Sequence, residues 1–371
     1  MKIAMIGHKR IPSREGGVEV VVESLAVRMA AMGHDVTAYN RMGRHVSGAE
    51  TVKIKEYKGV KIKTVPTFET SKLNAIVYAV IATILALFGR YDVVHFHAEG
   101  PCSMIWLPHL FGIRTIASIH GLDWQQSKWQ GFAVKFLKFG EKMAAKYADE
   151  VIVLSEETRQ YFLDTYGRET RIFNNGVEVH DYTEPKIIKE KYSLDKDDYI
   201  LFLARIVPVK GLPYLIKAFS SMKTDKKLVI AGGVSHSAEY EKEIREMAKG
   251  DDRIIFTGFI EGRELWELYS NCRLYVLPSD HEGMPLSLLE AMACGCECLV
   301  SDISATKNVV KEYGHTFKKS NVDDLKNKLE EIISHDKFYC KPGQGKQLEY
   351  IKTNYSWDTV TEKTLELYKK G

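Results

Sequence analysis

The stretch LYVLPSDHEGMPLSLLEAMACGCECLVS, residues 274–301, predicts a buried strand, a loop, a short helix and a second buried strand. The loop carries Glu282, and the helix carries Glu290 among leucine, alanine and methionine side chains. Burying an unpaired carboxylate costs on the order of several kcal/mol. A charge at position 290 therefore indicates either a ligand for this side chain or a conformation in which it reaches solvent.

The alternation of strand and helix continues on both sides of this stretch. On its amino-terminal side, strands are expected at 199–206, 227–233 and 253–259, with helices at 212–222, 240–250 and 264–272. An earlier set has strands at 2–7, 35–40, 92–98, 115–121 and 150–155 and a long helix over 16–33. This alternation is typical of α/β proteins, whose parallel sheets are covered by helices on both faces.

The sequence predicts two doubly wound domains. The first is placed at residues 1–180 and the second at 181–352, with the polar, loop-rich segment 174–198 around the join. A last helix within 353–371 is expected to cross back onto the first domain. Two such domains that face each other enclose one central cleft, and ligands of doubly wound sheets bind at the carboxyl ends of the strands.

Composition excludes some classes of function. The 371 residues are 45% hydrophobic and 27% charged, as in a soluble globular protein, and the net charge of +3 is too small to indicate nucleic acid as a partner. Three of the six cysteines form the pattern Cys294, Cys296, Cys298, which fits no common zinc motif, so buried thiols are expected. No signal peptide precedes the first strand, and a cytoplasmic protein is expected.

Two segments raise the question of a membrane. Residues 75–88 are apolar but too short to span a bilayer, which takes about 20 residues. A buried helix is expected there, and shallow bilayer contact is the alternative. Residues 128–147 predict a basic amphipathic helix, with Lys128, Lys135, Lys138 and Lys142, whose charged face contacts either solvent or anionic lipid headgroups. The lysine-rich segment 51–66 alternates like a hairpin at a sheet edge.

Several motifs of cofactor enzymes are absent from the sequence. The first strand leads into GHKRIPSREGG, which is neither a dinucleotide fingerprint nor a phosphate-binding P-loop. Gly16 and Gly17 nevertheless stand before the first long helix, after a loop with Arg10 and Arg14. A helix N-terminus of this kind attracts a phosphate, although a simple turn is the alternative.

A second group of candidate residues lies in the second domain. Arg205 ends a strand and Lys210 follows, so the two cations are positioned to hold a diphosphate and stabilise it as a leaving group. Two solvated surface cations are the alternative. Glu290 would accept hydrogen bonds from a ribose diol and Glu282 from sugar hydroxyls, with the Gly283 and Met284 amides close to the phosphates.

Three histidines of the first domain complete the set of candidates. His120 closes a strand and is expected to face the cleft. His95 and His97 alternate on another strand, so both point to one face, and a structural role is expected for this pair.

Together these segments resemble the GT-B fold glycosyltransferases of family 4, a retaining group. The resemblance rests on EGGVE (15–19), SIHG (118–121), LARIVPVKG (203–211) and EGMPLSLLEAMACG (282–295), in which Glu282 and Glu290 match the family's pair of glutamates separated by seven residues. It implies a nucleoside-diphosphate sugar as donor, with no cofactor and no metal. Pro285 departs from the family pattern, because it replaces a residue with an N–H group.

The resemblance also implies a role for each matching residue. Gly17 would lie beside the donor diphosphate, His120 near the transferred sugar, and Arg205 with Lys210 on the diphosphate. Glu282 would touch donor-sugar hydroxyls, and Glu290 would bind the ribose.

The amino-terminal segment MKIAMIGHKRIPSREGGVE, with SIHGLDWQQSKW, is similar to a narrower bacterial subgroup of rhamnosyltransferases in capsule or exopolysaccharide assembly. This similarity implies a glycan or polyprenyl-linked acceptor and a peripheral position at the inner face of the membrane. Two alternatives remain open: a GT-B sugar-nucleotide epimerase, and a catalytically silent nucleotide-sugar-binding protein.

Overall fold

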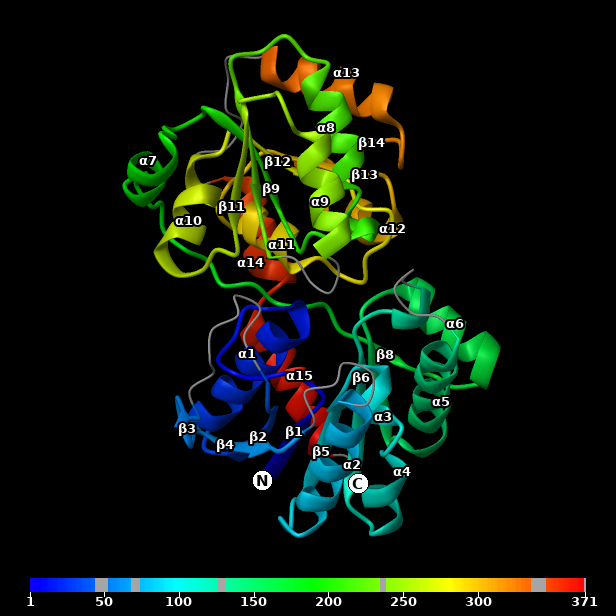
Figure 1. Ribbon diagram of the computed structural model, residues 1–371. Helices are drawn as coiled ribbons and strands as arrows, with labels where there is room; N and C mark the ends of the chain where they lie inside the picture. Colours follow the sequence, from blue (N-terminus) through cyan, green and yellow to red (C-terminus); the bar gives the residue numbers. More distant parts are fainter. Residues whose placement is uncertain (44–52, 68–73, 126–130, 234–237, 335–344, 370–371) are drawn as a thin grey trace. The chain divides into compact units, whose positions relative to one another are not determined.

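The structure is a computed structural model that describes residues 1–43, 53–67, 74–125, 131–233, 238–334 and 345–369 (Figure 1). It consists of two compact units. Unit 1 contains Met1–Gly176 with Trp357–Gly371, and unit 2 contains Val177–Ser356. The chain passes from unit 1 to unit 2 four residues earlier than the sequence predicted, and it returns at Trp357. The predicted cleft depends on how the two units are placed, and it stays a prediction.

Unit 1 is built on an eight-stranded sheet in the order β3-β4-β2-β1-β5-β6-β7-β8. All neighbours are parallel except β3 and β4, which form the expected antiparallel hairpin at the sheet edge. The strands are β1 (Lys2–Ile6), β2 (Asp35–Arg41), β3 (Glu56–Tyr57), β4 (Val60–Val65), β5 (Val93–His97), β6 (Arg114–Ile119), β7 (Glu150–Val153) and β8 (Arg171–Ile172).

Helices cover both faces of this sheet. On one face, α2 (Asn74–Leu87), α3 (Glu99–Cys102), α5 (Phe132–Tyr147) and α6 (Glu156–Tyr166) contribute to a core with alternate residues of the central strands. The short α4 (Trp106–Leu110) contacts α5. Helix α1 (Gly17–Ala31) lies beside the last helix, α15 (Trp357–Lys369), joined by an Arg28–Asp358 ion pair of 2.7 Å (Figure 1). Residues from the end of the chain therefore complete unit 1.

Unit 2 has a fully parallel six-stranded sheet in the order β11-β10-β9-β12-β13-β14. The strands are β9 (Tyr199–Leu203), β10 (Lys227–Ala231), β11 (Ile254–Gly258), β12 (Leu274–Leu277), β13 (Cys298–Ser301) and β14 (His315–Phe317). The chain runs outward from β9 to β11 and then returns to β12 beside β9, so the order reverses between β9 and β12. This is the doubly wound arrangement that the sequence predicted, and two α/β domains of this class are confirmed.

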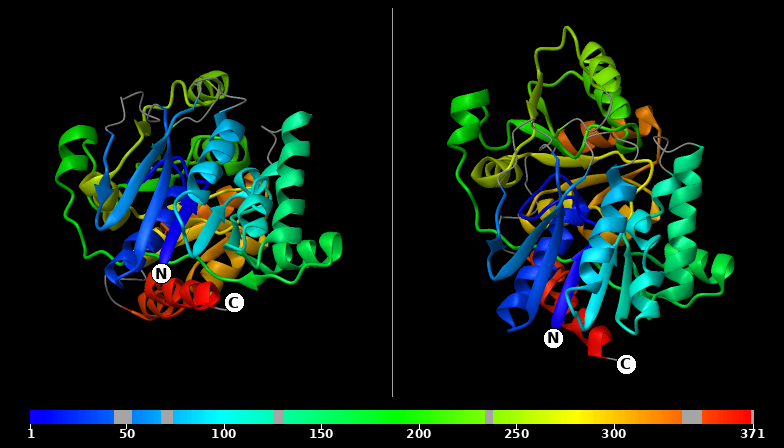
Figure 2. Two further views of the ribbon diagram at one scale, coloured as in Figure 1. Left: turned by 90° about the horizontal axis from the view of Figure 1, so that it is seen from below. Right: turned by 60° about the horizontal axis from the view of Figure 1, so that its bottom comes forward.

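Helices of unit 2 are divided between the two sheet faces (Figures 1 and 2). Helices α8 (Leu212–Ser220), α9 (Ala238–Met247) and α13 (Val322–Ser334) pack on one face. Helices α7 (Ile187–Tyr192), α10 (Gly262–Asn271), α11 (Leu286–Ala293), α12 (Ser304–Val310) and α14 (Lys346–Asn354) pack on the other. Both cores are made almost entirely of fully buried aliphatic and aromatic side chains.

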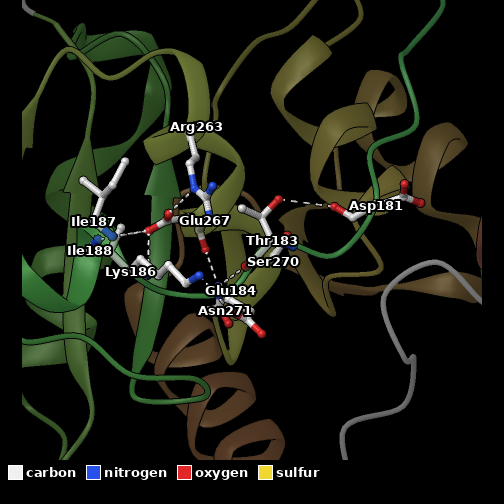
Figure 3. A network of polar contacts seen from close by, with 10 residues as sticks. All are labelled: Asp181, Thr183, Glu184, Lys186, Ile187, Ile188, Arg263, Glu267, Ser270 and Asn271. Atoms are coloured by element: carbon white, nitrogen blue, oxygen red, sulfur yellow. Dashed lines mark hydrogen bonds and ion pairs between the residues drawn. The ribbon is translucent and has the colours of Figure 1, made fainter.

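A network of polar contacts holds the start of unit 2 against α10 (Figure 3). The buried Glu267 carboxylate accepts the backbone N–H groups of Lys186, Ile187 and Ile188 at 2.9, 2.7 and 3.1 Å. It also forms an ion pair of 2.9 Å with Arg263. The segment 174–198, predicted to be loop-rich, therefore contains α7, because a carboxylate from another helix satisfies the N–H groups at its amino end.

The structure resolves three further expectations. Cys294, Cys296 and Cys298 are buried free thiols, and the strand β13 begins at Cys298, so the prediction of core cysteines is confirmed. The apolar segment 75–88 forms most of α2, which buries Tyr78, Ala82 and neighbouring side chains in unit 1 but leaves Ile84, Leu85 and the following Phe88 exposed. Within the described ranges, no helix has the length and apolar character needed to cross a membrane.

Candidate functional site

The reversal of strand order between β9 and β12 places two loops side by side at the carboxyl ends of these strands. In doubly wound sheets this is the position at which ligands bind. Gly211 lies between Lys210 and α8 with φ of +66°, and a Cβ atom there would come within 1.9 Å of the Pro278 carbonyl oxygen. The backbone N–H of Asp280 also donates to Val209 at 2.9 Å. The loops after β9 and β12 are thus in direct contact.

Two predicted site residues meet where these loops touch. Lys210 Nζ lies 2.5 Å from Glu282 Oε1, and the two side chains are only 14% and 8% exposed. The Ser279 hydroxyl donates to the same carboxylate oxygen at 2.6 Å. The side chains predicted to hold a diphosphate and a sugar therefore adjoin each other, and in this structure each neutralises the other's charge.

Arg205 lies two residues beyond the end of β9 and is partly exposed. Within the part of the chain that the structure describes, no hydrogen bond or ion pair engages its guanidinium. Arg205 therefore offers a cation at the carboxyl edge of the sheet whose hydrogen-bonding capacity is available to a ligand, in contrast to the paired Lys210.

Glu290 is buried in the second turn of α11, with 7% of its surface exposed. The hydroxyl of Tyr269, on α10, donates to Glu290 Oε2 at 3.2 Å. The alternative in which the Glu290 side chain extends into solvent is therefore wrong. Helix α11 begins at Leu286 with Pro285 as its N-cap residue, and Gly283 and Met284 occupy the loop immediately before it.

In unit 1, Gly16 is the N-cap residue of α1, and Gly17 is the first helical residue. The buried Glu19 carboxylate accepts the Lys9 backbone N–H at 2.8 Å. A Cβ atom on Gly16 would lie 2.5 Å from Glu19 Oε2. A carboxylate of the chain itself therefore lies against this helix N-terminus, where the sequence predicted a phosphate.

The histidines of unit 1 lie together at the carboxyl ends of β5 and β6. His97 Nδ1 is 3.1 Å from His120 Nε2, and the His95 and His97 rings stack at 4.1 Å between centroids. His95 also contacts Tyr368 of α15 at 2.5 Å and Ser118 at 2.8 Å. The expected common face of His95 and His97 is confirmed, and His97 is in addition a direct neighbour of His120.

Burial keeps these histidines neutral. It lowers the pKa of His95 to about 3 and that of His120 to about 4. The pKa of His97 is also well below its usual value, because desolvation disfavours the charged ring. A neutral imidazole can donate one hydrogen bond to a ligand and accept another, but it contributes no net charge.

Sequence analysis missed two residues that contact the predicted site. Tyr269 binds Glu290 from a different helix, and Ser279 binds Glu282 from the end of β12. Neither residue stands in a recognisable motif. Both are found only once α10 and β12 have been packed against α11. Among the described residues, no group of three histidine, cysteine or acidic side chains is placed to hold a metal ion.

Two family models match the chain in succession. The model described as Glycosyltransferase Family 4 matches residues 15–181, and the model described as Glycosyl transferases group 1 matches residues 184–348. The first match covers most of unit 1, and the second covers most of unit 2. Together they account for nearly the whole sequence.

The chain is similar in sequence to known proteins, one over its full length and another over about half of this chain. The chain is 24% identical over 415 residues to the uncharacterized glycosyltransferase MJ1607 of Methanocaldococcus jannaschii, covering 100% of this chain and 98% of that protein. It is 30% identical over 207 residues to the serotype-specific mannosyltransferase WbdA of Escherichia coli. That match covers 52% of this chain and only 25% of WbdA.

Solved structures with the same fold include a sucrose-phosphate synthase from Thermosynechococcus elongatus, with a TM-score of 0.84 and 21% identity over 100% of this chain and 98% of that one. Another is Anabaena Alr3699/HepE in complex with UDP and glucose, with a TM-score of 0.80 and 16% identity over 99% of this chain and 98% of that one. These likenesses concern the fold.

Proposed function

The chain belongs to the GT-B glycosyltransferases, with a Glycosyltransferase Family 4 domain followed by a Glycosyl transferases group 1 domain, and from this premise we propose a retaining transferase that uses a nucleoside-diphosphate sugar. The acceptor is a glycan or a polyprenyl-linked glycan of a bacterial cell surface. The observation that carries the proposal is the charged group at the β9–β12 reversal, where Lys210 pairs with Glu282 and Arg205 follows the end of β9.

The donor binds to unit 2 in this proposal. Arg205 binds a diphosphate oxygen first, because its guanidinium has no other described partner. Lys210 then shifts part of its interaction from Glu282 to the diphosphate, and the Glu282 carboxylate accepts hydroxyl groups of the sugar. Glu290, which Tyr269 already orients, accepts the ribose hydroxyls. Pro285 has no N–H, so the Gly283 and Met284 amides are the neighbouring backbone donors.

During transfer, the bond between the anomeric carbon and the diphosphate oxygen breaks, and a bond from the same carbon to the acceptor oxygen forms on the same face. The acceptor's proton passes to the departing diphosphate oxygen. Arg205 and Lys210 stabilise the charge that develops there, an interaction worth several kcal/mol. We propose that the reaction needs neither a metal ion nor an organic cofactor, and that His120 binds the transferred sugar as a neutral hydrogen-bonding group.

The direct test is a panel of nucleoside-diphosphate sugars with the purified full-length protein. Binding raises the melting temperature by an amount set by ligand concentration and Kd. A rhamnose donor comes first because of the amino-terminal resemblance, a mannose donor second because of the similarity to WbdA, and UDP-glucose third. Transfer to a polyprenyl-linked glycan in the presence of EDTA supports the proposal. Stabilisation by a donor without any product, across all acceptors, would favour a silent binding protein.

The same assay separates the transferase from a sugar-nucleotide epimerase. An epimerase converts the donor without an acceptor and releases an altered sugar nucleotide. A transferase consumes donor slowly by hydrolysis and rapidly only when an acceptor is added. Donor conversion that is independent of acceptor would therefore replace the proposed activity with epimerisation.

Helix α5 supports a peripheral position at the cytoplasmic face of the membrane. Its exposed side chains are all lysine or phenylalanine: Phe132, Lys135, Lys138, Phe139, Lys142 and Lys146. Phe132 is 73% exposed, and the only acidic residue of the helix, Glu141, is buried on the opposite face. Such a face binds anionic lipid through both charge and apolar contact. Lys128, also part of the predicted basic helix, lies outside the described residues.

Sedimentation with vesicles tests the membrane contact. Binding to phosphatidylglycerol vesicles, weak binding to phosphatidylcholine vesicles, and release by salt are expected for wild-type protein. Replacement of Lys135 and Lys142 by glutamate should abolish sedimentation, whereas the same change at Lys217 and Lys249 of unit 2 serves as a control. Equal binding to both kinds of vesicle would contradict an electrostatic contact.

A further inference from the structure

His97 contacts the predicted sugar-binding histidine from the neighbouring strand. It is the last residue of β5, where it pairs with Ser118 of the parallel strand β6, and His120 follows β6 by one residue. His97 Nδ1 lies 3.1 Å from His120 Nε2, and the two rings stack with centroids 5.4 Å apart. His97 has no exposed surface. A hydrogen bond between these two nitrogens fixes both the orientation of the His120 ring and the position of its proton.

The direction of that hydrogen bond follows from the other nitrogen of His97. His97 Nε2 is buried and has no hydrogen-bond partner among the described residues. If Nε2 carried the proton, a buried N–H group would be left without an acceptor, which proteins avoid more strictly than an unused acceptor. The proton of neutral His97 therefore resides on Nδ1, which donates to His120 Nε2.

This direction determines what His120 offers to a ligand. Both rings are neutral, because burial lowers the pKa values of His97 and His120. A neutral histidine that accepts at Nε2 carries its proton on Nδ1. The remaining nitrogen of His120 is then an N–H donor, which can bind a hydroxyl oxygen of a ligand. Because this nitrogen already carries a proton, His120 cannot act as the base that removes a proton from the ligand.

The backbone after His120 is held from the same end of β5. Glu99, the first residue of α3, accepts the Asp123 backbone N–H at its Oε1 atom at 3.1 Å. Glu99 itself is fully buried. Two contacts therefore hold the segment from His120 to Asp123. Glu99 binds the backbone of Asp123, and His97 binds the ring of His120.

We propose that His97 is a positioning residue that holds His120 in the Nδ1–H tautomer, so that His120 donates a hydrogen bond to an oxygen of the bound sugar. The role of His120 toward the sugar rests on the proposed function, whereas its tautomer does not. His97 reaches no ligand and acts only through His120.

Two variants and a control separate positioning from stability. His97→Asn keeps an N–H donor near the place of Nδ1, and His97→Leu removes it. Tyr368→Phe is the matched control, because it deletes one hydrogen bond to the neighbouring His95 and leaves the His97–His120 pair unchanged. Long-range ¹H–¹⁵N spectra of the full-length protein report which nitrogen of His120 is protonated, and melting temperatures report folding.

The wild type and His97→Asn should show His120 protonated at Nδ1, and His97→Leu should show a mixture or the Nε2–H form. With donor and acceptor, kcat of His97→Leu should fall about tenfold, a factor in line with one hydrogen bond. His97→Asn and Tyr368→Phe should stay within about threefold of wild type. A wild-type His120 protonated at Nε2 overturns the inference, as does full activity in a folded His97→Leu variant. If the wild type transfers no sugar, the proposed function fails, while the spectrum still decides the tautomer.

Discussion

The two sheets of this protein each reverse strand order once, and the side chains at the two reversals differ in charge. In unit 2, the loops at the β9–β12 reversal carry three charged residues: Lys210 and Glu282 form an ion pair, and Arg205 has no described partner. In unit 1, the β1–β5 reversal and the adjacent β6 gather neutral histidines, of which His95 and His97 are fully buried and His120 is partly exposed. The same topological position thus supports ionic recognition in one unit and neutral hydrogen bonding in the other.

Under the proposed function, the difference corresponds to the two parts of a nucleoside-diphosphate sugar. A diphosphate carries charge and calls for cations, which act strongly where water is partly excluded. A sugar carries hydroxyl groups, and a neutral donor with a fixed tautomer recognises these without the desolvation cost of a charge. Four predictions test this comparison, from the largest expected effect to the smallest.

The largest effect is expected from pH. Burial lowers the pKa of His8 to about 4 and that of His95 to about 3. The unfolded chain therefore binds more protons than the folded one as pH falls below the ordinary value of 6.5, and unit 1 loses stability on the order of 3 kcal/mol per histidine by pH 4. In unit 2, burial alone would raise the pKa of Glu267, but the hydrogen bonds from Arg263 and three backbone N–H groups lower it overall, so its contribution persists until pH falls below the ordinary glutamate value of 4.5.

Hydrogen exchange followed by mass spectrometry, corrected for intrinsic rates, measures the two units in one sample. Between pH 6.5 and 4.5, peptides of unit 1 should lose protection while those of unit 2 keep it. A parallel loss of protection in both units would contradict the contrast between neutral histidines and charged pairs.

Replacement of the cations in unit 2 should affect turnover next most strongly. Arg205→Ala and Lys210→Ala should each lower kcat by about 10²- to 10³-fold, because each removes stabilisation of the leaving diphosphate. Lys210→Ala should also lower the melting temperature, since it leaves the Glu282 carboxylate without its ion pair. Arg205→Ala should not, because Arg205 has no described partner to leave unpaired. Lys217→Ala, an exposed lysine on α8, is the control. Near-normal turnover in both site variants would remove Arg205 and Lys210 from the mechanism.

The third prediction concerns the anchoring of α7 in unit 2. Glu267→Ala deprives three backbone N–H groups of their acceptor, and it should lower the free energy of unfolding by about 2–3 kcal/mol. Glu241→Ala, which removes an exposed ion pair with Arg245, should cost less than about 1 kcal/mol. Urea unfolding monitored by circular dichroism measures both. Equal midpoints for the two variants would show that the network in Figure 3 contributes no more than a surface pair.

The smallest effect is expected at Tyr269. Tyr269→Phe removes the hydrogen bond that orients Glu290, so the donor KM should rise about tenfold while kcat changes little. Tyr275→Phe is the matched control, since Tyr275 donates to Ser287 in the same region and not to Glu290. If both variants raise the donor KM equally, the Tyr269–Glu290 contact has no separate role in donor binding.

The sequence predicted those features that depend on local pattern. Alternating strands and helices, the helix starting near Pro285, the buried thiols at 294–298 and the shared face of His95 and His97 all follow from periodicity and residue type. Other features depend on tertiary contacts between distant segments. The loop-rich segment 174–198 contains a helix because Glu267, some 80 residues later, satisfies its amino end.

The candidate site divides in the same way. Arg205, Lys210, Glu282 and Glu290 stand in recognisable patterns, but the ion pair between Lys210 and Glu282 joins residues 72 positions apart, through the contact of two loops. Tyr269 and His97 stand in no motif for this role. Each becomes a neighbour of a site residue only through strand order and helix packing.

Calorimetric titration of nucleoside diphosphates is the most direct measurement of the ionic site in unit 2. The wild type should bind one diphosphate tightly, and the double variant Arg205→Ala, Lys210→Ala should bind it at least about 100-fold more weakly, since each charge-assisted contact contributes about 1.5–3 kcal/mol. Tyr368→Phe, in unit 1, should bind like the wild type. Unchanged affinity in the double variant would contradict diphosphate binding by these two cations.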